Sequence, residues 1–314
     1  MKYGIIVLLG FVLAAVALYG CSSGPAKPGN NVSGTASGGT KRATSSTKDR
    51  AEVDPEEEPK AQVIYVRQRC IVVETENHVL VFDPVEFKTR RQKTFINGFV
   101  DIDQYRGSNV TVFITSAASD RFSPEIMAWR KRAKKVKFVI GPGVAERDAR
   151  FKGKGIYKAM PGKKLSFRGI KVDVVPVSRV GRQEPRVKSR MPRDSVAFLV
   201  SVDRLKIYYS GEYGGLSKAA ASAIPGDGEI NIACHAFNSR KGQAGRKGLV
   251  EFAKKFSPRM LVPVVPGGNT WVISRLAVEV SEATLGVHVW NYRKMGESFK
   301  YPDSLPSNRP SKKK

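Results

Sequence analysis

Short runs of β-branched and aromatic residues, separated by Gly, Pro, Asp or Asn, recur along the middle of the chain. Runs of this length and composition predict β-strands. The predicted strands cover residues 62–67, 70–74, 78–82, 110–114, 136–140, 170–176, 196–201, 206–210, 230–234 and 260–263. Helical patterns lie between several of them, over residues 123–135, 216–223, 246–256 and 269–283. Early hairpins followed by strands and helices predict a layered α/β domain with sheets inside and helices outside.

The first twenty residues have another pattern. Lys2 precedes an apolar run from Ile5 to Leu18, and the sequence Leu-Tyr-Gly-Cys ends at Cys21. A cation followed by a short apolar run is typical of a secretory signal segment. The ending resembles the bacterial lipobox, which implies that residues 1–20 are removed and that Cys21 is lipidated. The alternative is an uncleaved N-terminal anchor, although a spanning helix needs about 20 predominantly apolar residues. Both interpretations place the rest of the chain outside the cytoplasm, at the cell envelope.

The segments that flank the middle of the chain are poor in large apolar residues. Residues 21–60 are rich in Gly, Ser, Thr, Pro and charge, and this composition predicts a flexible tether. Residues 301–314 contain three prolines and end in three lysines, which predicts a basic disordered tail. Residues 61–300 are therefore predicted to form one folded domain. Its cysteines, Cys70 and Cys234, lie in apolar strand runs and are predicted to be buried free thiols.

The charge is strongly positive, with a formal net value of +26. About +21 belongs to residues 61–299, more than solubility requires, and this excess predicts an anionic partner. For a lipid-anchored envelope protein, on the periplasmic side of an outer membrane or the outer face of a plasma membrane, the candidates are phospholipid headgroups and anionic envelope polymers. Nucleic acid is a less favoured candidate, because the chain lacks an aromatic-and-basic recognition motif.

Four segments carry a family resemblance through their order. An early hairpin ends in Val-Phe-Asp-Pro at residues 81–84, and a later strand runs into Thr-Ser-Ala-Ala-Ser-Asp-Arg at residues 115–121. Lys-Ile-Tyr-Tyr-Ser-Gly-Glu and Leu-Val-Pro-Val-Val follow at residues 206–212 and 261–265. This order resembles the metallo-β-lactamase superfamily, most of all its lactonase-like and phospholipase-like hydrolases. The resemblance spans residues 62–295 and implies a four-layered αββα sandwich.

The same resemblance implies where the metal ligands of the family would lie. The matched positions are Ser116, Ala118, Asp120, Arg121, Ser178 or its neighbour Arg179, Glu212 and Val265. Only Asp120 and Glu212 can bind a cation, because the other side chains offer weak or no ligation. We therefore expect no catalytic residues and no metal cofactor, and we hypothesise that Arg121 and Arg179 replace the metals and pair with the two carboxylates.

Other interpretations of this cleft remain open at the level of sequence. The cleft can be filled by apolar residues, with the charged side chains in solvent. The protein can also be an enzyme of altered chemistry that acts on an ester, lactone or phosphodiester. Such an enzyme would hold one divalent metal at Asp120 and Glu212, or work without a metal. The favoured interpretation is an inactive relative of the hydrolases that binds an anionic ligand or a protein partner.

Two basic runs stand out. The stretch from Ser178 up to, but not including, Asp194 contains one acid, Glu184, and six cations: Arg179, Arg182, Arg186, Lys188, Arg190 and Arg193. In the family this segment follows a ligand-bearing strand, where arginine forks would suit phosphate or carboxylate, although a solvated basic loop is an equal alternative. The second run, residues 130–135, is interpreted as the solvated face of a helix that turns Trp129 and Ala133 inward.

Overall fold

We analysed a computed structural model, which describes residues 57–177, 195–211, 218–224, 230–237, 242–265, 267 and 269–305. These residues build two seven-stranded mixed β-sheets. The first sheet has the order β14-β1-β2-β3-β4-β5-β6. Its strands are β1 (Ala61–Arg67), β2 (Cys70–Thr75), β3 (His78–Phe82), β4 (Asn109–Ile114), β5 (Lys137–Ile140), β6 (Ile156–Lys158) and β14 (Ser298–Tyr301). Strands β3, β4, β5 and β6 are parallel, so their carboxyl ends lie at one edge of the sheet.

The second sheet has the order β13-β12-β11-β10-β9-β8-β7. Its strands are β7 (Lys164–Phe167), β8 (Ile170–Val177), β9 (Ser195–Val202), β10 (Leu205–Tyr209), β11 (Ile232–Ala236), β12 (Met260–Val264) and β13 (His288–Val289). Strands β10 to β13 are parallel, whereas β9 runs antiparallel to both β8 and β10. The beginning of β9 and the end of β10 therefore lie at the same edge.

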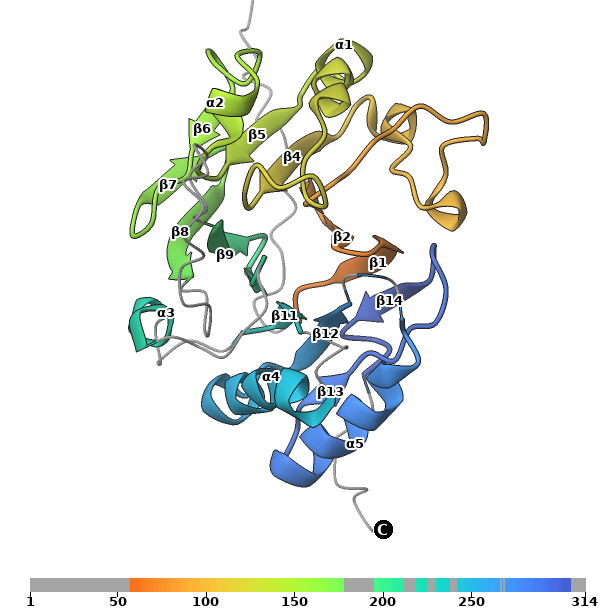
Figure 1. Ribbon diagram of the computed structural model, residues 1–314, viewed down its shortest axis with the longest axis vertical. Coiled ribbons are helices and arrows are strands. Elements are labelled where there is room, and N and C mark those ends of the chain that lie inside the picture. Colours follow the sequence, from red (N-terminus) through yellow and green to blue (C-terminus); the bar gives the residue numbers. More distant parts are fainter. Residues whose placement is uncertain are drawn as a thin grey trace, which may run out of the picture. The chain divides into compact units, whose positions relative to one another are not determined.

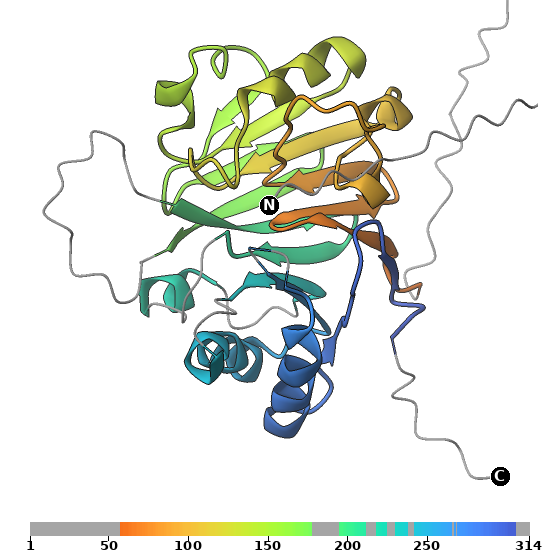
Figure 2. The same ribbon diagram turned by 45° about the vertical axis from the view of Figure 1, so that its right-hand side comes forward.

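Helices cover the outer faces of both sheets, as Figures 1 and 2 show. The α-helices are α1 (Trp129–Arg132), α2 (Val144–Arg147), α3 (Lys218–Ala223), α4 (Gly242–Phe256) and α5 (Val272–Ala283), and short 3₁₀ turns are η1 (Phe95–Asn97), η2 (Ile102–Tyr105) and η3 (Pro124–Ala128). One apolar cluster fills the space between the sheets and continues beneath α4 and α5. A second cluster lies between the first sheet and α1 and α2. The predicted αββα sandwich is confirmed.

The ten predicted strands all form, and the four that the sequence missed are β6, β7, β13 and β14. These four are the outer strands of the two sheets. Edge strands are short and polar because one side faces water, so they lack the apolar runs on which the prediction depended. Strand β14 also extends the folded domain beyond residue 300, since Tyr301 pairs with Ala61 and is buried. The predicted tail therefore begins too early.

The helix predicted over residues 123–135 is wrong in length and in type. A 3₁₀ turn, η3, occupies its start, and the α-helical part ends at Arg132. Trp129 and Ala133 are buried, as predicted, while the basic residues between them are partly or fully exposed. Cys70 and Cys234 are buried free thiols, also as predicted. Within the described residues, no helix is both long enough and apolar enough to cross a bilayer.

Candidate functional site

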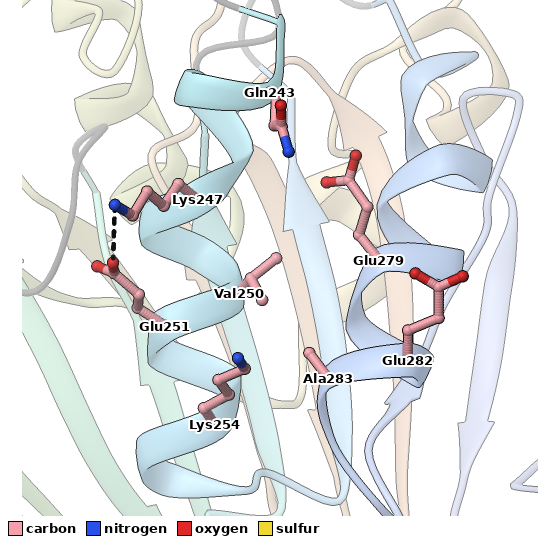
Figure 3. Close-up of a pocket in the computed structure, with 8 residues that line it drawn as sticks. All are labelled: Gln243, Lys247, Val250, Glu251, Lys254, Glu279, Glu282 and Ala283. Atoms are coloured by element: carbon pink, nitrogen blue, oxygen red, sulfur yellow. Dashed lines mark ion pairs between the residues drawn. The ribbon is translucent and has the colours of Figure 1, made fainter.

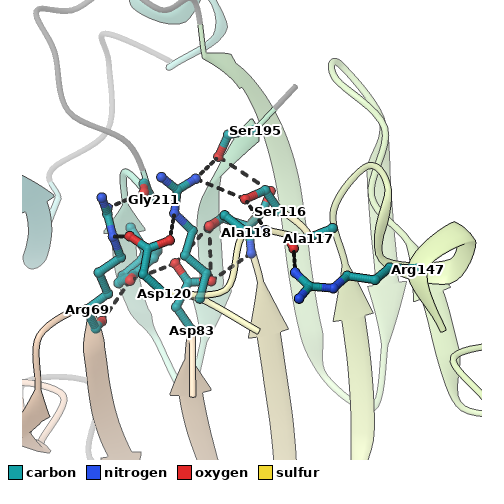
Figure 4. A network of polar contacts seen from close by, with 12 residues as sticks. Arg69, Asp83, Ser116, Ala117, Ala118, Asp120, Arg147, Ser195 and Gly211 are labelled. Carbon is teal, nitrogen blue, oxygen red and sulfur yellow. Dashed lines mark hydrogen bonds and ion pairs between the residues drawn. The ribbon is translucent and has the colours of Figure 1, made fainter. Parts of the chain in front are cut away.

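The candidate site lies where six strands begin or end at one edge of the two sheets (Figure 4). Asp83 follows β3, and Ser116 follows β4. Ser195 begins β9, Gly211 follows β10, and Arg69 belongs to the tight turn between β1 and β2. The strand directions bring these residues together although they are far apart in the sequence.

Gly211 joins the two sheets at this edge. Its φ of +65° favours glycine. A Cβ at this position would lie 2.5 Å from Thr115 Cγ2 and 2.9 Å from the Val196 carbonyl oxygen, so a larger residue would not fit. Its own carbonyl oxygen accepts a hydrogen bond from Arg69 Nη1 at 2.7 Å. This glycine therefore fixes the end of β10 against the end of β4.

Asp83 is the buried acceptor of the site. Its carboxylate accepts hydrogen bonds from the Thr115 backbone N–H at 2.7 Å and from Thr115 Oγ1 at 2.7 Å. Tyr209 Oη lies 3.0 Å from Asp83 Oδ2 and 2.8 Å from the Arg69 carbonyl oxygen. Burial raises the pKa of Asp83 to about 6, against the positive charge of Arg121 and the hydrogen bonds from Thr115. From the sequence, Asp83 was predicted only to end a strand and was not assigned to the site.

Asp120 lies between two guanidinium groups. Arg69 Nε donates to Asp120 Oδ2 at 2.8 Å, and Arg121 Nε lies 3.7 Å from Asp120 Oδ1. Both arginines are buried, whereas the Asp120 side chain is 44% exposed. Partial burial raises the pKa of Asp120, but the charges of Arg69 and Arg121 outweigh it and hold this pKa below its usual value. Asp120 is thus an ionised carboxylate that remains accessible to solvent.

Arg121 also contacts two hydroxyl groups. Its Nη1 atom donates to Ser116 Oγ at 3.0 Å and to Ser195 Oγ at 3.1 Å. Arg121 thereby connects the segment after β4 with the first residue of β9. We refer to Arg69, Ser116, Asp120, Arg121 and Ser195 as the arginine cluster. Beside it, Arg147 of α2 donates to the Ala117 carbonyl oxygen (Figure 4).

The structure brings together only part of the predicted site. Ser116, Asp120 and Arg121 meet in the arginine cluster, Ala118 is partly exposed beside them, and Val265 is buried in the apolar core. The remaining predicted positions lie outside the described residues: Ser178, Glu212, Arg179, Arg182, Arg186, Lys188, Arg190, Arg193 and the lipidation site Cys21. The pairing predicted between Arg179 and Glu212 therefore stays a prediction.

Arg69 and Ser195 are cluster residues that sequence analysis missed. Arg69 follows Gln68, whose φ of +44° makes the tight turn between β1 and β2. The available signal was a two-residue turn between apolar strands, which places a turn side chain at the sheet edge. Ser195 directly follows the basic segment 178–194, and this position was a comparable signal for a residue of the site.

The histidines lie elsewhere. His235, in β11, is buried against Phe252 with ring centroids 4.8 Å apart, and burial lowers its pKa to about 4. His78 begins β3, at the opposite edge of the sheet, and His288 begins β13. Across the part of the chain that the structure describes, no three His, Cys, Asp or Glu residues are grouped closely enough to hold a metal ion.

A concave region lies on the outer helix layer, between α4 and α5 (Figure 3). This groove has a volume of about 710 Å³ and is lined mainly by charged side chains, including Lys247, Glu251 and Glu279. The side chains neutralise one another, since Lys247 lies 3.9 Å from Glu251 and Arg246 makes two hydrogen bonds to Glu279. Because its charges are balanced internally, the groove is a weaker candidate than the arginine cluster.

No protein-family model and no curated protein matches the sequence. Solved structures do match. A metallo hydrolase from the archaeon Ignicoccus hospitalis has a TM-score of 0.55 and 17% identity, over 77% of this chain and 98% of that one. The metallo-beta-lactamase fold protein YhfI from Bacillus subtilis has a TM-score of 0.51 and 11% identity, over 77% and 100% of the two chains. The chain has the metallo-β-lactamase fold.

Isothiocyanate hydrolase from Delia radicum gut bacteria has the same fold, with a TM-score of 0.52 and 11% identity over 76% of this chain and 98% of that one. At these identities the likeness concerns the fold alone. It confirms the resemblance that the order of the sequence segments indicated.

Metallo-β-lactamase folds imply a metal centre, and the described side chains do not fit one. Ser116 and Arg121 bond to each other, and Val265 is enclosed in the core. A guanidinium group is a permanent cation, so Arg121 would repel a metal ion held by Asp120. Neither it nor Arg69 offers a lone pair to a metal. Among the described positions matched to metal ligands, only Asp120 has a suitable donor.

Proposed function

We propose that this protein is a non-catalytic member of the metallo-β-lactamase fold that binds an anionic ligand at the former metal cleft and is held at the cell envelope by a lipid on Cys21. The observation that carries the proposal is the arginine cluster. Arg69 and Arg121 flank Asp120 where the resemblance expects metal ions, and Arg121 Nη1 also contacts two hydroxyl groups. Guanidinium and hydroxyl donors suit phosphate or carboxylate oxygens.

The chain topology supports the choice of ligand. Val177 of β8 pairs with Ser195 of β9, so the two residues that flank the basic segment 178–194 lie together at the edge of the sheet. Ser195 contacts Arg121 directly. The six cations of the segment are therefore attached to the chain next to the arginine cluster, which raises the local positive charge available to an anion.

Metal analysis of the purified full chain tests the loss of the metal centre. After equilibration with zinc and gel filtration, we expect less than about 0.1 zinc per chain, because Asp120 lies beside two fixed cations and makes a poor metal ligand there. Stoichiometric zinc that disappears in both Asp120→Asn and Glu212→Gln would overturn the proposal. It would favour the hydrolase of altered, mononuclear chemistry instead.

Calorimetric titration with inorganic phosphate tests the ligand. Arg121→Gln should weaken phosphate binding about tenfold or more, because it removes a charge-assisted donor. The matched control is Arg275→Gln, since Arg275 is an exposed α5 residue that pairs with Glu279 at 3.6 Å, away from the cleft. Equal loss in both variants would reduce the effect to net charge. Unchanged binding in Arg121→Gln would contradict the site.

The anchor has its own test. Radiolabelled palmitate should enter the chain in bacterial cells, and Cys21→Ser should abolish the label and move the chain from the membrane fraction to the soluble fraction. Label retained in Cys21→Ser would contradict lipidation at this cysteine. Anion binding at the arginine cluster does not depend on that outcome.

A further inference from the structure

An exposed apolar patch lies beside the end of β1, where Arg67 stacks on Phe87. Its members are Phe87, Ile96 and Met295, together with Trp271 at the start of α5. Ile96 is 74% exposed and Trp271 is 79% exposed, so these side chains protrude into solvent. Large apolar side chains gathered at one surface, with cations around them, mark an interaction site more often than single exposed ones do.

The contacts within the patch show that it is continuous. Met295 Sδ and the Arg67 side chain lie over Gly98, 2.8 Å and 3.2 Å from where a Cβ would be, and Ile96 lies against Gly296. The Arg67 guanidinium stacks on the Phe87 ring at 4.9 Å from its centroid. Trp271 joins this surface through Arg293, whose guanidinium lies 4.9 Å from a Trp271 ring centroid. We call this surface the apolar rim.

Cations are frequent in the chain segments that form the apolar rim. The cations in its segments are Arg67, Lys88, Arg90, Arg91, Lys93, Arg293 and Lys294. The two nearby carboxylates are occupied: buried Glu86 pairs with Lys93 at 3.1 Å, and Glu297 accepts from the backbone N–H groups of Arg293 and Lys294. The segments that form the rim therefore combine protruding apolar side chains with an excess of cations.

We propose that the apolar rim docks the domain onto an anionic bilayer surface. Trp, Phe and aliphatic side chains bury their apolar parts at the boundary between headgroups and acyl chains, while Lys and Arg contact the lipid phosphates. The charge complementarity favours this occupant over a second copy of the chain, since two copies would bring two cationic rims together. The proposal goes beyond anion binding in the cleft and does not depend on the Cys21 lipid.

Trp271 gives a direct readout of docking. The chain has three tryptophans, and the other two, Trp129 and Trp290, are buried. The experiment uses the unlipidated full chain carrying Cys21→Ser, mixed with vesicles of phosphatidylcholine and phosphatidylglycerol (7:3) or of phosphatidylcholine alone. Insertion should shift the Trp271 emission to shorter wavelength by about 5–10 nm with the anionic vesicles, and brominated acyl chains should quench it.

Paired variants locate the surface. Phe87→Ser combined with Ile96→Ser should weaken partitioning about tenfold or more, because two inserted side chains are lost. Replacing Lys88, Arg90 and Arg91 by Gln should weaken it about fivefold per cation at low salt. The matched control is Leu285→Ser, because Leu285 is 96% exposed just beyond the other end of α5, about 18 Å from Trp271.

The outcomes separate docking from its alternatives. An emission maximum that does not move with anionic vesicles overturns the proposal, as does an equal loss in Leu285→Ser. Equal binding to anionic vesicles and to vesicles of pure phosphatidylcholine would show that the cations do not contribute, and it would overturn docking onto an anionic surface. Sedimentation velocity without lipid adds a further arm: a dimer that Ile96→Ser dissociates would assign the rim to self-association. Because every changed side chain is exposed, thermal melting curves that match the unsubstituted chain show that the variants are folded.

Discussion

The two edges of the β-sandwich each hold a polar cluster, and the two clusters differ in how completely their carboxylates are bonded. At the edge opposite the arginine cluster, Asp203 connects three turns by hydrogen bonds. We refer to Asp203, Thr75, Asn77, His78 and the Arg168 carbonyl as the turn cluster. Asp203 accepts from Thr75 Oγ1 at 2.6 Å, from two nitrogens of Asn77, and lies 3.2 Å from His78 Nδ1. His78 Nε2 lies 2.8 Å from the Arg168 carbonyl oxygen.

In the arginine cluster, by contrast, Asp120 takes one close hydrogen bond from Arg69 and one looser contact from Arg121, and it is 44% exposed where the Asp203 side chain is 11% exposed. A carboxylate with four short polar contacts and little exposure fixes local structure. A carboxylate with fewer close contacts and greater exposure can be displaced from its cations by another anion. The turn cluster therefore stabilises the fold, whereas the more open Asp120 suits the anion binding proposed for the arginine cluster.

Asp203→Ala should separate the two clusters most strongly. It removes four hydrogen bonds at about 1 kcal/mol each, so we expect a loss of about 4 kcal/mol in the free energy of unfolding. Urea denaturation measures this loss. Phosphate binding by the folded fraction should stay unchanged, because the cleft lies at the other edge. Asp203→Asn, which keeps the shape and suits the φ of +44°, should lose less. Equal effects of Asp203→Ala and Asp120→Ala on stability would contradict the comparison.

The protonation of Asp83, beside the arginine cluster, makes the free energy of unfolding depend on pH. Its pKa is raised to about 6 from 3.8, so between these values the folded state binds a proton that the unfolded state releases. Stability should therefore fall by up to about 3 kcal/mol as pH rises from about 4 to 6, and this contribution should be constant above 7. Denaturation of the unsubstituted chain and of Asp83→Asn across pH 4 to 7.5 isolates this contribution, since other groups titrate alike in both. Parallel profiles would show that Asp83 does not titrate in this range.

The interior of the fold could be predicted because buried strands carry a clear signal. Strands β3 and β4 are apolar on both faces, and their ranges were predicted to within one residue. The edge strand β7 alternates exposed and half-buried residues and contains two charged or polar positions, so its pattern resembled a loop. The sequence pattern therefore detected strands that are buried on both faces. It did not detect strands by their intrinsic propensity.

The site could be predicted only where a motif is contiguous in the chain. Ser116, Asp120 and Arg121 fall within one segment and were found through its resemblance to a family motif. Arg69 lies 51 residues before its partner Asp120, and Ser195 lies 74 residues after Arg121. The first pairing arises from the strand order within the first sheet and the second from the packing of the two sheets, and no local pattern encodes either.

Asp120→Asn gives the smallest expected effect and the finest test of the comparison. Because Asp120 is largely accessible, its removal should change the free energy of unfolding by less than about 1 kcal/mol. It should raise the affinity for inorganic phosphate about threefold to tenfold at low salt, since the ligand no longer competes with a fixed carboxylate for Arg69 and Arg121. Calorimetric titration at two salt concentrations measures both the gain and its screening. Weaker phosphate binding in this variant would mean that Asp120 positions the guanidinium groups for the ligand instead of competing with it, and the arginine cluster would then resemble the turn cluster after all.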